Sequence, residues 1–108
     1  MRIEVEDKNN AAVVSLQGDL DFNSYAGFHD RMLALIDNKV AKIVVNLGAV
    51  GHIDSMGLGT LTKLWKIGEL GGVSVVLAAV PPNVGKLIKL INLDNRMKVF
   101  DTTDSALA

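Results

Sequence analysis

The first part of the chain alternates apolar and polar positions. Ile3 and Val5 are each followed by a polar residue, and the stretch 13–17 alternates in the same way, with the polar run 7–10 between them. A period of two is typical of half-buried strands. The pattern therefore predicts a β-hairpin whose second strand ends at Gly18.

Later apolar runs lack this alternation. Residues 43–47 and 73–79 are short, nearly continuous runs, rich in β-branched side chains. Such runs are typical of central strands that are covered on both faces. Residues 97–100 predict a last short strand. The polar stretch 19–23 and the segment 48–53 are expected to be loops.

Three segments between these strands repeat apolar residues at helical spacing. The first is expected to run from Ser24, a candidate N-cap, to about Asp37. The second begins near Ser55 and ends at the glycines 71–72, which permit the positive φ of a helix stop. The proline pair 81–82 opens the third. The predicted inward positions are Tyr25, Phe28, Met32, Leu35 and Ile36, then Leu58, Leu61, Leu64 and Trp65, then Val84, Leu87, Ile88 and Ile91.

The predicted order is β-β-α-β-α-β-α-β within one domain, residues 1–108. Strands that alternate with helices predict a mixed, mostly parallel sheet with a leading antiparallel hairpin, packed against helices. The expected fold class is α/β. Residues 101–108 leave room for one or two turns of helix.

Composition and charge narrow the function. The chain of 108 residues has 11 Lys and Arg against 12 Asp and Glu, so it lacks the concentrated basic footprint of a direct nucleic-acid binder. It has no cysteine, which excludes disulfides and thiolate chemistry. The apolar run 73–80 is far shorter than a membrane span of about 20 residues. We expect no membrane insertion, and the acidic N-terminus does not match a signal peptide. A soluble, cytoplasmic protein is expected.

The segment 54–59, Asp-Ser-Met-Gly-Leu-Gly, lies where a buried strand and its loop lead into a helix. Its simplest interpretation is a helix N-cap. However, each glycine near a helix start costs about 0.5–1 kcal/mol relative to alanine. At about 100° per residue, Met56, Gly59 and Lys63 fall on the outward face, with Ser55 at its border. This face favours the close approach of a partner.

Enzyme and ligand motifs are missing from the same segment. Ser55 is not in G-x-S-x-G, and His52 and Asp54 are too near in sequence to relay its proton. The glycines lack the third position of G-x-G-x-x-G, and no G-x-x-x-x-G-K-[ST] occurs. The two histidines, His29 and His52, have no clustered carboxylates. No enzyme activity, catalytic residue, metal or cofactor is predicted.

Three groups of residues match a known family over nearly all of the chain. Residues 18–21, Gly-Asp-Leu-Asp, are similar to the sequence Gly-Glu-Leu-Asp of that family. A second match joins residues 43–47 and 53–59, which are similar to the family's signature strand, loop and helix start. Weaker matches lie at 87–94 and Phe100. The chain resembles the STAS-domain anti-sigma factor antagonists of bacteria.

The resemblance implies a switch protein. In that family, the serine at the position of Ser55 is phosphorylated by a partner that is both an anti-sigma factor and a serine kinase. The unphosphorylated form sequesters this partner and releases a sigma factor, and a phosphatase reverses the modification. ATP and Mg²⁺ would belong to the kinase. The expected partner-binding residues are Asp21, Asp54, Met56, Gly57, Gly59 and Lys63.

The chain departs from the family pattern at two places. Asn46 stands where the family usually has aspartate, which removes a negative charge expected near the phosphoserine. The chain stops at residue 108, where many members continue their last helix. We therefore expect exposed apolar surface on the sheet or the third helix, for a partner or a homodimer mate to cover.

Two other functions stay open. One is a STAS-like adaptor of a transport or stress-signalling complex, in which Ser55 is never phosphorylated but the same helix face binds. The other is a small module that binds a nucleotide or another anion at the glycine-bearing helix start.

Overall fold

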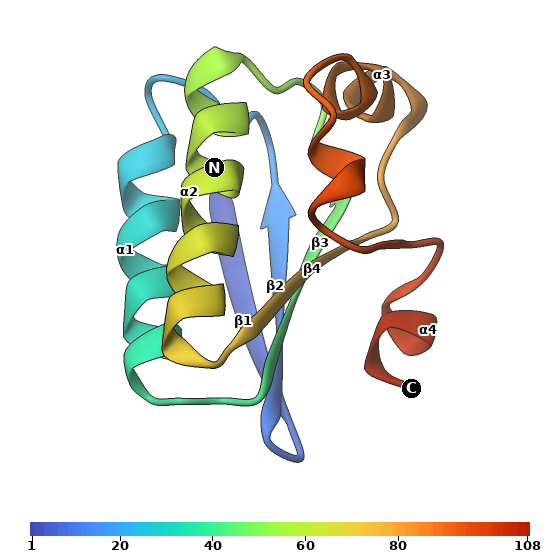
Figure 1. Ribbon diagram of the computed structural model, residues 1–108. Helices are drawn as coiled ribbons and strands as arrows, with labels where there is room; N and C mark the ends of the chain where they lie inside the picture. The colour runs from blue at the N-terminus through green and yellow to red at the C-terminus, as the bar shows by residue number, and fades with distance from the viewer.

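Five strands form one mixed sheet in a computed structural model that describes residues 1–108 (Figure 1). The strands are β1 (Arg2–Lys8), β2 (Ala11–Gln17), β3 (Lys42–Ala49), β4 (Ser74–Ala78) and β5 (Val99–Phe100). They lie side by side in sequence order. β1 and β2 pair antiparallel, and all other neighbours pair parallel. The predicted α/β class, leading hairpin and mostly parallel sheet are confirmed.

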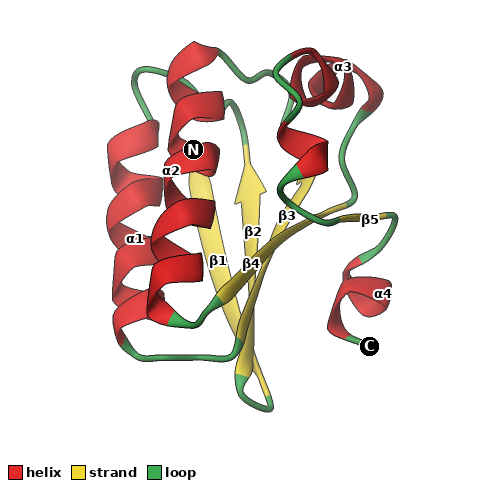
Figure 2. Cartoon of the chain, in the orientation of Figure 1, coloured by secondary structure: helices red, strands yellow, loops and turns green.

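The helices cover the two faces of the sheet unequally (Figure 2). One face carries the helices α1 (Tyr25–Asp37), α2 (Ser55–Gly71) and α3 (Pro82–Leu90), and the other carries α4 (Thr103–Leu107). A short 3-10 turn, Leu93–Asn95, follows α3. The core beneath the first three helices contains 21 buried residues, whereas the cluster beneath α4 contains 5. Most of the hydrophobic stabilisation therefore lies on the α1–α3 side.

Strand alternation separates these two clusters. Ile43, Val45 and Leu47 of β3 face α1 and α2, whereas Val44 belongs to the cluster on the α4 side. Because successive side chains of a strand point to opposite faces, Asn46 also faces the α4 side. Asn46, which lies within the strand run that matched the family signature, is thus turned away from α2.

The helices begin and end close to the predicted residues, but Ser24 does not cap α1 as predicted. Gly72 ends α2 with a φ of 76°, and Pro82 begins α3. Ser24 precedes α1 as expected, but its side chain does not cap the helix. Its hydroxyl donates to the Asp19 carbonyl oxygen at 2.7 Å and accepts from the Asp21 N–H at 3.0 Å. Ser24 therefore stabilises the loop that precedes α1.

Residues 101–108, which were expected to leave room for one or two turns of helix, contain the short helix α4. The side chain of Lys42 donates to the Ala106 carbonyl oxygen at 2.8 Å, and Ala106 is fully buried against the sheet. Exposed apolar side chains remain around α3 and β5, at Leu90, Ile91 and Val99. No helix of the chain combines the length and the apolar character needed to cross a membrane.

Candidate functional site

Two loops meet where β2 and β3 end. The loop after β2, residues 18–24, is called the Leu20 loop below. An isolated parallel bridge joins Leu20 to Ile53, and both side chains are buried. The Leu20 N–H donates to the His52 carbonyl oxygen at 3.0 Å, and the Asp54 N–H donates to the Leu20 carbonyl oxygen at 3.3 Å. The stretch predicted to be a polar loop is thus anchored by a core leucine.

Asp54 fastens the Leu20 loop to the first turn of α2. One carboxylate oxygen accepts from the Gly57 N–H at 2.9 Å, and the other accepts from the Phe22 N–H at 3.0 Å. The hydrogen bond from the Gly57 N–H is the main reason that the pKa of Asp54 lies below its ordinary value, and the bond from the Phe22 N–H adds to this effect. Both bonds favour the charged carboxylate over the neutral acid. Asp54 is therefore the N-cap of α2, which leaves the next residue without that structural task.

That next residue, Ser55, is the first of α2, and its side chain is exposed. Two other hydroxyl groups near this end of the domain are already engaged. Thr60 is only 6 % exposed and donates to the Met56 carbonyl oxygen at 2.7 Å. Ser24 is held within the Leu20 loop. Of these three residues, Ser55 is the one that is exposed and whose hydroxyl makes no hydrogen bond within the protein.

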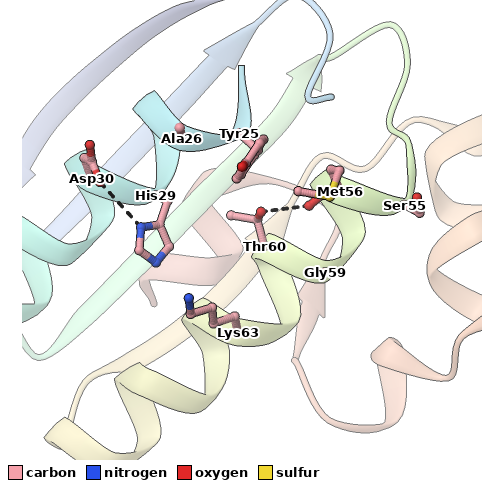
Figure 3. Close-up of a pocket in the computed structure, with 9 residues that line it drawn as sticks. All are labelled: Tyr25, Ala26, His29, Asp30, Ser55, Met56, Gly59, Thr60 and Lys63. Atoms are coloured by element: carbon pink, nitrogen blue, oxygen red, sulfur yellow. Dashed lines mark hydrogen bonds and ion pairs between the residues drawn. The ribbon is translucent and has the colours of Figure 1, made fainter. Parts of the chain in front are cut away.

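A groove of about 360 Å³ runs between α1 and α2 and begins at Ser55 (Figure 3). In Figure 3, Tyr25 and His29 extend from α1 on one side, and Met56 extends from α2 on the other. Nδ1 of His29 lies 3.5 Å from a carboxylate oxygen of Asp30. The groove is lined by Tyr25, Ala26, His29, Asp30, Ser55, Met56, Gly59, Thr60 and Lys63.

The outward face predicted for α2 is this groove wall. Ser55, Met56, Gly59 and Lys63 all line the groove and are all exposed. Their helical spacing therefore brings together four of the residues expected around the phosphorylation site.

Gly57 has a different environment from the other predicted partner-binding residues. It is buried, and a Cβ atom at this position would overlap the Leu20 carbonyl oxygen and lie 2.7 Å from Cγ1 of Ile53. A Cβ at Gly59 would meet nothing within 4 Å. The expectation that Gly57 contacts a partner stays a prediction, and the structure gives this glycine a packing role within the domain. The missing side chain lets α2 pack directly against the Leu20 loop.

Asp21 also has a structural task. Its carboxylate accepts from the Asn23 N–H at 2.9 Å and from the Ser24 hydroxyl at 3.3 Å. It does not line the groove. Asp21 therefore shapes the turn that presents the neighbouring Phe22.

Sequence reasoning missed the groove wall formed by Tyr25 and His29 of α1, and it also missed the neighbouring Phe22. Its side chain is 69 % exposed, and its ring centroid lies 6.3 Å from that of Tyr25 at the mouth of the groove. Aromatic residues of this kind often dominate the energy of protein interfaces. The available signal was one large aromatic side chain in the otherwise polar stretch 19–23.

Asn46 lies away from this site. Its amide nitrogen donates to the Ser15 hydroxyl at 3.2 Å, and its amide oxygen accepts from the Gly48 N–H at 3.0 Å. The side chain faces the opposite side of the sheet from α1 and α2. Asn46 does not line the groove that contains Ser55, and it lies instead among residues of the α4 side such as Thr103 and Leu107.

The groove joins three chemical features. The Ser55 hydroxyl lies at a helix start, where unpaired backbone N–H groups favour an anion. Met56 and Tyr25 line the groove together with Ser55 and form its apolar rim, and Phe22 lies against Tyr25 outside the lining. Lys63 adds a cation further along α2. No group of three or more His, Cys, Asp or Glu side chains is placed to hold a metal ion. The arrangement suits a modifiable surface for binding another protein.

The fold and the groove define a small α/β domain that presents a serine at a helix start. The chain belongs to the STAS domain family, whose model matches residues 2–106. The resemblance seen in the sequence is thereby confirmed at the level of the family.

The chain is similar to three other proteins. The anti-sigma F factor antagonist of Paenibacillus polymyxa is 27 % identical over 108 residues, which covers 99 % of this chain and 92 % of that protein. The crystal structure of an anti-sigma factor antagonist from Mycobacterium paratuberculosis is 28 % identical, with a TM-score of 0.85 and coverage of 98 % and 90 %. The Bacillus cell fate determinant SpoIIAA in its phosphorylated form has a TM-score of 0.77, 20 % identity and coverage of 98 % and 96 %.

Proposed function

We propose that this protein is an anti-sigma factor antagonist whose partner binding is controlled by phosphorylation of Ser55. Without phosphate, it sequesters an anti-sigma factor that is also a serine kinase, and a sigma factor is released. A phosphatase restores this form. The observation that carries the proposal is the exposed Ser55 hydroxyl at the mouth of the groove between α1 and α2. The names of the relatives from Paenibacillus polymyxa and Mycobacterium paratuberculosis support the class of partner.

The first turn of α2 accommodates the modification. The kinase transfers the γ-phosphoryl group of ATP to Oγ of Ser55, so that an O–P bond forms, ADP leaves and the hydroxyl proton passes to a base of the kinase. Phosphoserine adds about −1.5 to −2 charges. An anion at a helix start is stabilised by about 0.3–1 kcal/mol. Asp54 keeps its own bonds to Gly57 and Phe22, so the fold is expected to persist.

The partner surface changes much more than the fold. The phosphate stands on the residue that directly follows Asp54, and it shares the groove lining with the apolar side chain of Met56. A partner that covers this rim must either remove water from the phosphate or place its own groups against the negative charge, and both cost binding free energy. Each 1.4 kcal/mol of such cost weakens binding about tenfold. SpoIIAA, which shares the fold, has itself been solved in a phosphorylated form.

Calorimetric titration with the cognate kinase tests the proposal. Ser55→Ala is expected to bind like the wild type, and Ser55→Asp and Ser55→Glu about tenfold more weakly or worse. Ser74→Asp is the matched control, because it adds the same charge at an exposed serine at the start of β4. It is expected to bind like the wild type.

Mass spectrometry after incubation with the kinase and Mg-ATP locates the phosphate. The proposal expects it on Ser55. A phosphate on Ser24 or Thr60 contradicts the site, since both hydroxyls are engaged within the protein. Equal affinity of the wild type, Ser55→Ala and Ser55→Asp contradicts the switch and favours an adaptor that uses the same groove without phosphorylation.

A further inference from the structure

A second groove lies between α3 and β5. It has a volume of about 410 Å³ and shares no residue with the groove at Ser55. Val80, Ile88 and Val99 supply apolar lining, and Lys86 and Lys89 are exposed along it. This α3–β5 groove is therefore apolar inside and positively charged at its border.

The backbone of β5 is open along this groove. β5 is the last strand of the sheet, so one of its sides has no neighbour (Figure 2). The carbonyl oxygens of Lys98 and Phe100 accept from the N–H groups of Leu77 and Ala79, at 3.0 and 3.1 Å. Backbone groups of successive strand residues point to alternate sides. The N–H and C=O of Val99 therefore face the open edge.

The opposite edge of the sheet is protected against strand pairing. Along β1, Arg2 pairs with Glu4 at 2.9 Å and Lys8 pairs with Glu6 at 2.8 Å. Charged side chains along an edge strand hinder the addition of another strand. β5 has no such ion pairs, and Val99 is 44 % exposed there. β5 has only two residues, so its edge offers one free backbone pair, the N–H and C=O of Val99, to an added strand.

Positive charge gathers around this edge although the whole chain has a net charge of −1. Two exposed acidic residues lie here: Asp94, which lines the groove, and Asp101, which follows β5. Four cations lie in the stretch 86–98, all exposed and none in a salt bridge: Lys86, Lys89, Arg96 and Lys98. An acidic ligand would neutralise this charge at little desolvation cost, because the cations are already at the surface.

We propose that the α3–β5 groove binds an extended, acidic segment of a protein partner by strand addition to β5. The segment pairs its backbone with the N–H and C=O of Val99 and inserts an apolar side chain beside Ile88. Its carboxylates lie against Lys86 and Lys89. Since this surface shares no residue with the Ser55 groove, it binds whether or not Ser55 carries a phosphate.

Nuclear magnetic resonance of the isotope-labelled protein tests this interaction. The probe is a short synthetic peptide of alternating glutamate and valine, and the same peptide with lysine in place of glutamate is its control. The glutamate peptide is expected to shift the amide signals of Ile88 and Val99 saturably, with an affinity that falls as salt rises. The lysine peptide is expected to leave them unchanged. Ser55→Asp is expected to bind the glutamate peptide like the wild type.

Charge reversal identifies the surface. Lys86→Glu with Lys89→Glu is expected to weaken peptide binding about tenfold or more. Arg31→Glu with Lys66→Glu reverses two exposed charges on α1 and α2 and is the matched control, expected to bind like the wild type. Val99→Pro removes the edge N–H and is expected to abolish binding.

Three results overturn the proposal. The first is the absence of shifts at Ile88 and Val99 with the glutamate peptide. The second is an equal loss of binding in the control pair of charge reversals. The third is binding of anionic phosphatidylglycerol vesicles that depends on Lys86 and Lys89 while the peptide does not bind, which would assign the surface to a membrane.

Discussion

Gly57 and Gly59 lie two residues apart in α2, yet their surroundings differ completely. Gly57 is packed against the Leu20 loop, where Asp54 and Leu20 tie the helix start to the rest of the domain. Gly59 faces the groove and open space. One side of the first turns of α2 thus fixes the position of Ser55, and the other side is free for a partner. A modification on the free side can change binding while the fold persists.

Gly57→Ala is expected to cause the largest loss of stability. Its Cβ would overlap the Leu20 carbonyl oxygen, so α2 must move away from the Leu20 loop. Overpacking of this kind costs about 1–3 kcal/mol. The better helix propensity of alanine offsets at most about 1 kcal/mol of that cost. Urea unfolding measures the difference in the free energy of unfolding. A variant as stable as the wild type would show that α2 can shift away from the Leu20 loop without a loss of stability.

Asp54→Asn is expected to lower the melting temperature in a pH-dependent way. Asparagine can still accept from the Gly57 N–H, but its NH₂ group cannot accept from the Phe22 N–H. The folded-state pKa of Asp54 is lowered from its ordinary value of 3.8. The carboxylate therefore stabilises the fold above that value, and this stabilisation is lost as the pH falls through the lowered pKa.

Thermal unfolding at a series of pH values checks this sign. The wild type is expected to melt above Asp54→Asn at neutral pH, and the difference is expected to narrow in strong acid. Asp7→Asn removes the same charge from an exposed residue of β1 and controls for net charge. A melting difference that does not depend on pH would mean that the carboxylate charge contributes nothing to the link between α2 and the Leu20 loop.

Local periodicity was sufficient to predict the elements and one wall of the site. The step of about 100° per residue placed Met56, Gly59 and Lys63 on one face, and the groove confirms that face. The same step shows that Gly57 points elsewhere, but it cannot show what lies there. The contact with Leu20 joins the start of α2 to a loop that is distant in the sequence, and no local pattern reports such a contact.

The other wall of the site depends on tertiary structure in the same way. Tyr25 has the spacing of a core position in α1, yet it lines the groove because α1 packs beside α2. Phe22 looks like an ordinary loop residue until the bond to Asp54 fixes its backbone. Asn46 was expected near Ser55 because it stands where the family usually has an aspartate, in the same signature as Ser55. Strand alternation places it on the opposite face of the sheet.

Gly59→Ala is expected to have the smallest effect on stability, with the opposite sign to Gly57→Ala. Its Cβ meets nothing within 4 Å, so the helix gains about 0.5–1 kcal/mol from the better propensity of alanine. The added methyl group projects into the groove, so the affinity for the kinase is expected to fall while the free energy of unfolding rises. Urea unfolding and calorimetric titration measure the two quantities separately. An unchanged affinity would place the partner away from this wall of the groove, and a loss of stability would show that the free side of α2 is packed after all.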